Sequence, residues 1–246
     1  MVRPVPRRLG REPILEAIWE MRFTSDQAPV ADLLPGMVYK ALSEHYPKLI
    51  RLPAANIPHP VADREEAFRF VPTLRLESDP FSVQIGERVV SLNCRRPYAG
   101  WPEFARRIGE LAAVLKETGL LTKPERFSLK YIDLIELEEP PSLSYLNVAT
   151  DVGGRDLGKH PVHIRTEIEE DGLVHVLQIA SPAEVRLGRG EAHKGVLVDI
   201  DSIQKAGPED FWSTLNERVD KAHALSKDVF FSLLSDNTLE QLQPEY

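Results

Sequence analysis

The chain contains 246 residues, of which 42% are hydrophobic, enough for the core of one large domain or of two closely joined ones. The single cysteine, Cys94, excludes an internal disulfide and a cysteine-rich metal site, so we expect it to pack in the core. A formal net charge of −8 argues against a dedicated nucleic-acid binder. No apolar run is long enough to span a membrane, and the N-terminal segment lacks the apolar core of a signal peptide. The sequence therefore predicts a cytoplasmic protein without a membrane anchor.

The first half of the chain begins with a basic, proline-rich lead over residues 1–13 and continues as an α+β segment over residues 14–122. Residues 14–23 alternate apolar and polar side chains, which predicts a strand, with a helix as the alternative. Helical spacing follows between Pro29 and Tyr46. The apolar residues at this spacing are Leu33, Leu34, Val38, Ala41 and Leu42.

The segment from Leu52 to Arg64 is rich in proline and is expected to be an irregular connection. Strands are predicted from Phe68 to Arg95, with Gly86 and Glu87 as a two-residue turn between two of them. The cross-strand pairs that follow from this turn are Phe81 with Leu92 and Val83 with Val90.

The second half, residues 123–246, is expected to repeat this order of elements. In chain order we expect a strand from Phe127 to Leu137, a short helical piece near Leu143 to Val148, a glycine-rich loop from Asp151 to Gly158, a hairpin from Val162 to Ile179 around Asp171-Gly172, a turn near Gly188-Arg189-Gly190, a last strand from Val196 to Ile203, a long helix from about Pro208 and a helical tail after Asp236.

The order of predicted elements is the same in the two halves of the chain, which predicts an internally duplicated α+β fold. Each half opens on a strand and closes on an amphipathic helix with an aromatic residue near its start, Phe104 in the first helix and Phe211 in the second. We therefore expect two similar β-α-β(n)-α halves that form a continuous or paired antiparallel sheet, with both long closing helices on one face.

Several motifs spread along the chain carry a family resemblance. They are Pro13-x-x-Glu16-Ala17-Ile18-x-Glu20-x-Arg22-Phe23, Leu33-Leu34-Pro35-Gly36, Tyr46-Pro47, Pro97-Tyr98-x-Gly100-Trp101-x-x-Phe104 and Arg126-x-x-Leu129-x-Tyr131-Ile132-Asp133. Together they resemble a sporadically distributed, uncharacterised family of bacterial proteins of about this length. The resemblance implies a shared fold and assigns no catalytic site. The order of elements also resembles the duplicated arrangement of TATA-binding-protein-like and helix-grip proteins, which is an analogy of fold alone.

Three acidic residues on predicted strands form a candidate site. Asp133 lies on the first strand of the second half, and Asp199 and Asp201 share one face of its last strand. If these strands are neighbours, the three carboxylates could bind a divalent cation or raise one another's pKa. The favoured alternative is that they hydrogen-bond to turns or pair with Lys130 and Arg126.

Histidines give a second candidate set. His163, Arg165 and Glu167 alternate on one side of a strand, which is typical of a solvated sheet face. A two-residue Asp171-Gly172 turn would place His175 on the opposite face, whereas a three-residue turn would bring it to the same one. His223 lies at the edge of the apolar stripe of the last helix, where a half-buried histidine is favoured over a catalytic one.

Four arginines define a candidate patch for an anionic partner. Arg95, Arg96, Arg106 and Arg107 lie close in sequence, although solvated strand and helix faces are the favoured interpretation.

The sequence lacks the common enzyme signatures. No phosphate loop, dinucleotide fingerprint, nucleophile elbow or zinc-protease motif is present, so no cofactor is predicted and a non-enzymatic role is favoured. The leading hypothesis is a protein-binding or regulatory module, and the family resemblance suggests an accessory defence or antitoxin-like role. A homodimer is compatible with the sequence. The alternatives are an RNA-binding or RNA-processing module that uses the loop from Leu187 to Gly195 with His193, and a small-molecule enzyme with an acidic pocket.

Overall fold

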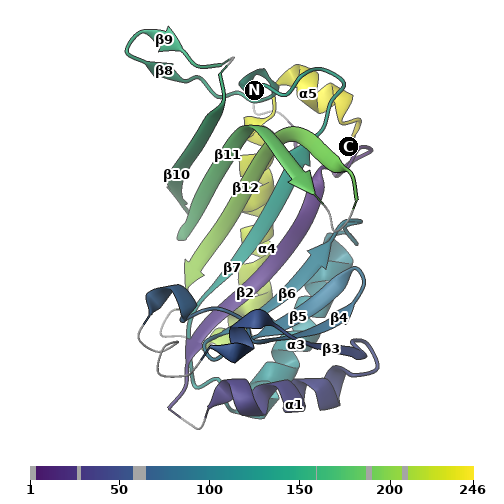
Figure 1. Ribbon diagram of the computed structural model, residues 1–246, viewed down its shortest axis with the longest axis vertical. Coiled ribbons are helices and arrows are strands. Elements are labelled where there is room, and N and C mark those ends of the chain that lie inside the picture. Colours follow the sequence, from purple (N-terminus) through teal and green to yellow (C-terminus); the bar gives the residue numbers. More distant parts are fainter. Residues whose placement is uncertain (1–3, 27–28, 58–64, 159, 187–189, 207–209) are drawn as a thin grey trace. The chain divides into compact units, whose positions relative to one another are not determined.

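The computed structural model describes residues 4–26, 29–57, 65–158, 160–186, 190–206 and 210–246. The expected turn at Gly188-Arg189, the start of the final helix at Pro208 and the part of the irregular connection from residue 58 to Arg64 lie outside these ranges. The protein has an α+β fold in which helices pack on a large antiparallel sheet, as predicted (Figure 1). Among the described residues, no helix is both long and apolar enough to cross a membrane.

The chain folds into two compact units, and each is assembled from segments that are distant in sequence. Unit 1 contains Met1–Leu15, Lys130–Ser202 and Ala222–Tyr246, and unit 2 contains Glu16–Leu129 and Ile203–Lys221. Strands β2, β7 and β12 and helix α4 each contribute residues to both units.

Unit 2 holds the strand order β7-β2-β6-β5-β4-β3. Its strands are β2 (Ile14–Thr24), β3 (Lys48–Arg51), β4 (Leu74–Ser78), β5 (Phe81–Ile85), β6 (Val89–Arg95) and the first part of β7 (Lys123–Ile135). Its helices are α1 (Val30–Leu42), α3 (Trp101–Thr118) and the short 3-10 helices η1 (Pro53–Asn56) and η2 (Glu66–Phe68). A strand was expected to begin at Phe68, but Glu66–Phe68 form the 3-10 helix η2. The next strand, β4, begins at Leu74.

The strand alternation predicted for residues 14–23 is confirmed in β2. Every second side chain from Leu15 to Phe23 is buried, while the residues between are partly exposed. Helix α3 packs on the apolar side of this unit's sheet, where the Phe104 ring stacks on Phe81 with centroids 6.5 Å apart. Cys94 is also fully buried on this side, as expected.

The hairpin between β5 and β6 has a different register from the predicted one. Val83 pairs with Leu92 and Ile85 with Val90, so the tight turn falls on Glu87-Arg88 and not on Gly86-Glu87. A shift of two residues preserves the side-chain faces because the strand repeat is two, so the predicted apolar face is unaffected.

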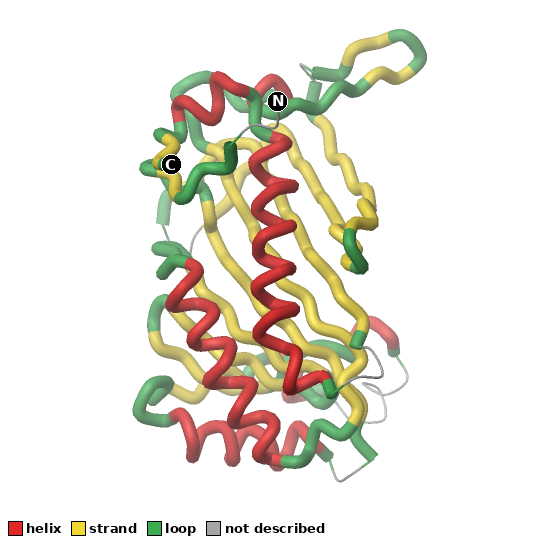
Figure 2. Tube along the Cα trace, turned by 180° about the vertical axis from the view of Figure 1, so that it is seen from behind, coloured by secondary structure: helices red, strands yellow, loops and turns green. Residues whose placement is uncertain are grey.

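Helix α1 buries a narrower stripe than its spacing predicts. Leu34, Val38 and Leu42 are buried, whereas Leu33 and Ala41 point to solvent. Figure 2 shows α1 and α3 on the same side of the unit 2 strands.

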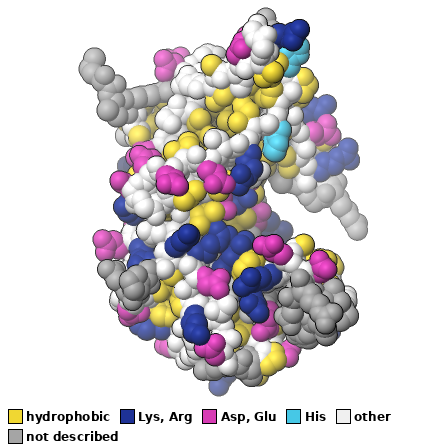
Figure 3. Space-filling model, turned by 90° about the vertical axis from the view of Figure 1, so that its left-hand side faces the viewer, with side chains coloured by type: hydrophobic (Ala, Val, Ile, Leu, Met, Phe, Trp, Pro, Cys, Tyr) yellow, Lys and Arg dark blue, Asp and Glu magenta, His cyan; other side chains and the backbone are white. Residues whose placement is uncertain are grey.

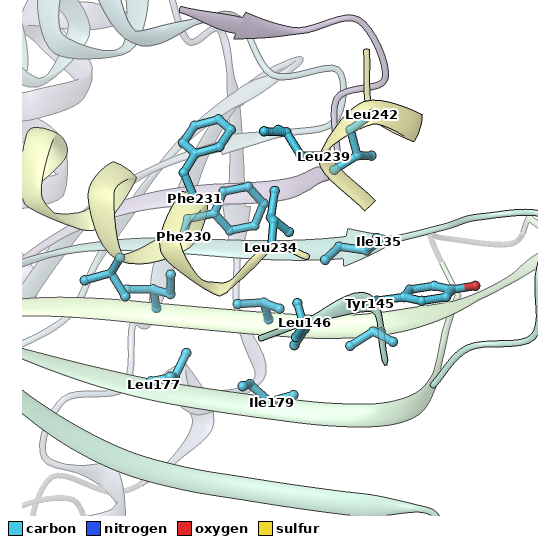
Figure 4. Close-up of a cluster of buried hydrophobic side chains, with 14 of the residues drawn as sticks. Ile135, Tyr145, Leu146, Leu177, Ile179, Phe230, Phe231, Leu234, Leu239 and Leu242 are labelled. Atoms are coloured by element: carbon cyan, nitrogen blue, oxygen red, sulfur yellow. The ribbon is translucent and has the colours of Figure 1, made fainter. Parts of the chain in front are cut away.

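Unit 1 holds the strand order β10-β11-β12-β7. Its elements are β1 (Arg8–Leu9), β8 (Asp151–Val152), β9 (Arg155–Asp156), β10 (Val162–Glu170), β11 (Leu173–Arg186), β12 (Ala192–Lys205), β13 (Pro244–Glu245), η3 (Leu143–Tyr145), α4 (Phe211–Leu233) and α5 (Asp236–Gln241). Figure 4 shows its core, in which Phe230, Phe231 and Leu234 pack against strand residues such as Leu177 and Ile179.

Short pairings tie the ends of unit 1 together. Arg8 and Leu9 pair with Glu245 and Pro244, and Leu9 is buried in the core. Part of the basic, proline-rich lead, Arg8–Leu9, is therefore an ordered strand.

Strand order follows the same rule in each half of the chain. In the first half β2 lies beside the last strand β6, and β5, β4 and β3 follow in reverse order. In the second half β7 lies beside the last strand β12, and β11 and β10 follow in reverse order. The segments after the opening strands differ, since α1 spans three turns while η3 is a single 3-10 turn.

Candidate functional site

A cavity of about 350 Å³ lies beside the N-terminus of α1 in unit 2. Its lining residues are Ala31, Asp32, Arg51, Ala54, Ala55, Ile57, Phe68, Val71, Thr73, Leu74 and Glu87. Most of these side chains are apolar and a few are charged or polar, which is the usual composition of a small binding site. We call this site the α1 cavity.

Glu87 fixes the N-terminus of α1 at one wall of the α1 cavity. Its two carboxylate oxygens accept hydrogen bonds from the backbone N–H groups of Val30 at 3.1 Å and of Ala31 at 2.9 Å. The first N–H groups of a helix have no partner within the helix, and a carboxylate there also interacts favourably with the helix dipole. The hairpin turn that carries Glu87 thus positions the helix.

Gly86 allows a second wall to approach closely. A Cβ at this position would lie 2.7 Å from the carbonyl oxygen of Val71, which no larger residue could tolerate without a backbone shift. Thr73 continues this wall, since its backbone N–H donates to the Ile85 carbonyl at 2.8 Å. Arg51 borders the cavity and donates to the Ala55 carbonyl at 2.9 Å.

Large exposed hydrophobic side chains are concentrated around this cavity in sequence. Five of the nine found among the described residues fall between residues 33 and 68, namely Leu33, Met37, Tyr39, Leu49 and Phe68. Phe68 lines the α1 cavity itself and is 38% exposed. Leu33 and Met37 on α1 are four residues apart, so these two side chains share one face of the helix. An exposed aromatic ring at the wall of a cavity and a helix face with two exposed apolar side chains are both features of interaction surfaces.

The other side of the unit 2 sheet is polar and its charges are paired. Glu77, which is 8% exposed, accepts hydrogen bonds from Lys48 at 2.9 Å and Arg95 at 2.5 Å, with Arg75 at 3.7 Å. The hydrogen bond from Lys48, followed by that from Arg95, lowers the pKa of the Glu77 carboxyl despite its burial.

The four arginines predicted as a patch do not form one surface. Arg95 lies on the polar side of the sheet, opposite the side that carries α3. Arg106 and Arg107 lie on α3, where Arg106 contacts Glu103 and Glu110 and Arg107 contacts Glu103 at 2.9 Å. Arg96 follows Arg95 after the end of β6. On the face shown in Figure 3, Lys and Arg side chains likewise have Asp and Glu side chains close by.

The three candidate acids do not meet. Asp133 shares the face of Tyr131 and lies on the side of α4, whereas Asp199 pairs with Lys130 on the opposite face at 2.9 Å. Asp201 shares the face of Asp199 by strand alternation. A site in which all three carboxylates meet, the less favoured hypothesis, is therefore not formed, and Asp199 pairs with Lys130 as in the favoured alternative. Among the described residues, no group of three or more His, Cys, Asp or Glu side chains is placed to hold a metal ion.

Burial dominates the electrostatics of two of these acids. Burial raises the pKa of Asp133 well above its ordinary value, with smaller contributions from the charges of Glu12 and Asp199. Burial also raises the pKa of Asp199, although the hydrogen bond from Lys130 opposes this effect.

The histidine set is divided between the two faces of its hairpin. Asp171 and Gly172 form the two-residue turn, so His175 pairs with Ile168 and faces away from Glu167. Arg165 and Glu167 form an exposed ion pair at 2.8 Å, and His163 is exposed on the same strand.

His175 is fully buried, and its Nδ1 lies 2.8 Å from Oγ of Ser202. Its Nε2 is buried with no hydrogen-bond partner among the described residues. Burial lowers the pKa of His175.

His223 lies on α4 and contacts Tyr131 on β7. Its Nδ1 lies 2.9 Å from the Tyr131 hydroxyl, and burial, aided by the charge of Lys227, lowers its pKa to about 4. The imidazole is therefore neutral at pH 7. This arrangement agrees with the half-buried histidine that the sequence favoured.

Sequence reasoning missed the α1 cavity and the role of Glu87. The cavity is built from segments that are separated in sequence and lack a motif, and Glu87 acts on a helix 56 residues away. A signal was present in Leu33 and Met37, since the helix carries apolar residues on more faces than one core contact needs.

Comparison of the chain with models of known protein families and with curated proteins found no match.

Proposed function

We propose that the protein is a non-enzymatic protein-binding module whose α1 cavity takes an apolar side chain of its partner. The observation that carries this proposal is a small, mainly apolar cavity with the exposed ring of Phe68 in its wall, built in part from the stretch of chain that holds five of the nine large exposed hydrophobic side chains among the described residues. In many protein interfaces a large side chain of one protein fills a pocket of the other, and the contacts around that pocket exclude water.

The chemistry of the lining suggests the residues of the partner. Ala54, Ile57, Phe68 and Leu74 offer apolar contacts to an aliphatic or aromatic side chain. Asp32 is exposed at the cavity, whereas Glu87 already accepts two backbone N–H groups. We therefore expect a basic residue beside the apolar anchor. The family resemblance adds that such a partner could belong to an accessory defence or antitoxin-like system.

Paired charges make the RNA-binding alternative less favourable. A nucleic-acid interface needs several basic side chains that can face phosphates, because affinity depends on the phosphates that are neutralised. Arg95, Arg106 and Arg107 are engaged by carboxylates, and His193 lies 2.8 Å from Glu136.

The proposal can be tested with peptides displayed at random and selected on the full chain. We expect enriched peptides to share a large apolar residue next to Lys or Arg. Ala54→Trp, which fills the cavity, and Phe68→Ser, which removes an exposed wall, should each weaken binding of a selected fluorescent peptide by at least about tenfold at unchanged thermal stability. Val152→Ser removes an exposed apolar side chain in unit 1 and is the matched control.

Two results would contradict this function. Selected peptides that bind both cavity variants as well as the wild type would show that the cavity is not the site. Binding of a defined RNA at physiological salt, with affinity lost on Arg95→Ala, would instead favour the nucleic-acid alternative.

We further propose that residues 14–122 and 123–246 are two versions of one supersecondary unit. The common rule of strand order supports this, as does the aromatic residue near the start of each closing helix, Phe104 in α3 and Phe211 in α4. An experimental structure should allow residues 14–119 to be superposed on residues 126–233, strand on equivalent strand. A different direction or order in any equivalent strand would refute the duplication.

A further inference from the structure

Strand β10 forms one edge of the sheet. It pairs with β11 along all nine of its residues and stands at the end of the strand order, so no strand of the described chain pairs with its outer edge. Figures 1 and 2 both show β10 at the margin of the sheet. An edge strand presents unpaired backbone N–H and C=O groups and can template a further strand.

The side chains of β10 divide by face. His163, Arg165, Glu167 and Glu169 lie on one face, while Ile164, Thr166 and Ile168 lie on the face that His175 shares. Ile168 remains 39% exposed, although Ile164 packs against the core. The edge therefore carries an uncovered apolar group beside alternating charges.

The part of this strand from His163 to Glu169 is complementary to itself in one antiparallel register. When a second copy is centred on Thr166, Arg165 lies opposite Glu167 of the copy and Ile164 lies opposite Ile168. His163 then faces Glu169, and the two Thr166 side chains face each other. Cross-strand pairs of opposite charge, of two β-branched residues and of two threonines are each favourable.

Neighbouring registers lack this match. Centring the pair on Arg165 places the two Arg165 side chains opposite each other, and centring it on Glu167 does the same with two carboxylates. A shift of a single residue sets isoleucines opposite charged residues. The favourable register also obeys the twofold symmetry that closes a dimer, since each contact occurs twice.

We propose that β10 pairs with β10 of a second copy of this chain, so that two sheets join through Thr166 in a twofold dimer. The interface consists mainly of one strand pair and is smaller than a standard protein interface, so the dissociation constant should be on the order of micromolar. The α1 cavity takes no part in this contact, and neither proposal depends on the other.

Charge reversal tests the register directly. Arg165 and Glu167 are 54% and 52% exposed, so changing them should not disturb the fold. Arg165→Glu places like charges opposite each other twice in the dimer, and Glu167→Arg does the same with the opposite sign. The double variant Arg165→Glu/Glu167→Arg restores both pairs. Arg186→Glu is the matched control, because Arg186 makes a similar exposed ion pair with Glu184 on β11, away from the β10 edge.

Sedimentation equilibrium of the full chain over about two decades of concentration measures the dissociation constant. Each single reversal should weaken the dimer by about tenfold, while the double variant and the control should stay within about twofold of the wild type. A wild-type monomer throughout would overturn the proposal. So would a dimer that either single reversal leaves unchanged, or a double variant that stays as weak as the single ones.

Discussion

Acidification should destabilise the protein through His223, whose pKa is about 4 in the folded state against an ordinary value of 6.5. At pH 7 the imidazole is neutral in the folded protein and mostly neutral in the unfolded chain, so protonation of His223 costs little stability there. As the pH falls below 6.5 the unfolded chain takes up a proton, while the folded protein does not do so until about pH 4. Stability is therefore lost between these values, and linkage gives about 2.5 kcal/mol by pH 4.5.

The assay is urea unfolding at pH 7 and at about pH 4.5 for the wild type and for His223→Gln, which removes the titrating group. Other buried groups also titrate: the lowered pKa of His175 acts in the same direction, and the raised pKa values of Asp133 and Asp199 act in the opposite one. The difference between the two proteins isolates His223. We expect the wild type to lose about 2–3 kcal/mol more than the variant. Parallel pH profiles would refute a neutral His223 held by burial.

Three further changes test the packing described above by their urea midpoints. Phe104→Ala should destabilise by about 3–5 kcal/mol, because the fully buried ring leaves a cavity; an unchanged midpoint would move this ring to an exposed binding surface. Glu87→Ala should cost about 1–2 kcal/mol by removing the acceptor at the start of α1, and less if water replaces the carboxylate. Gly86→Ala should lower the urea midpoint markedly, because the new Cβ would clash with the Val71 carbonyl oxygen; an unchanged midpoint would mean that the backbone at Val71 can move at little energetic cost.

Strand positions and faces could be predicted from sequence because both depend on local alternation. The alternation in β2 and the Asp171-Gly172 turn are confirmed, since each rests on neighbouring residues. The predicted register of the β5–β6 hairpin was wrong because the prediction took Gly86 as a residue of the turn. In the structure a glycine is needed there because Val71, from a separate segment, approaches closely.

The candidate sites were harder to predict for the same reason. Asp133 and Asp199 lie on opposite faces of neighbouring strands. Which residues of these strands pair, and therefore which face each carboxylate takes, cannot be read from the alternation within either strand. The contact between His223 and Tyr131 joins a helix and a strand 92 residues apart. The sequence presents Arg95 as a candidate for binding an anionic partner, but its guanidinium pairs with Glu77 on another strand.

The discontinuous composition of unit 1 has a consequence for the order of events during synthesis. Strand β1 needs Pro244–Glu245 as its partner, and the core around Leu177 needs the phenylalanines of α4. On the ribosome, unit 1 cannot be completed until nearly all of the described chain has emerged, whereas strands β2 to β6 and helix α3 of unit 2 emerge as one stretch. Contacts between such distant segments slow folding and leave apolar strands exposed in the meantime. The nascent chain should therefore depend on chaperones mainly through the segment from Lys130 to Ser202.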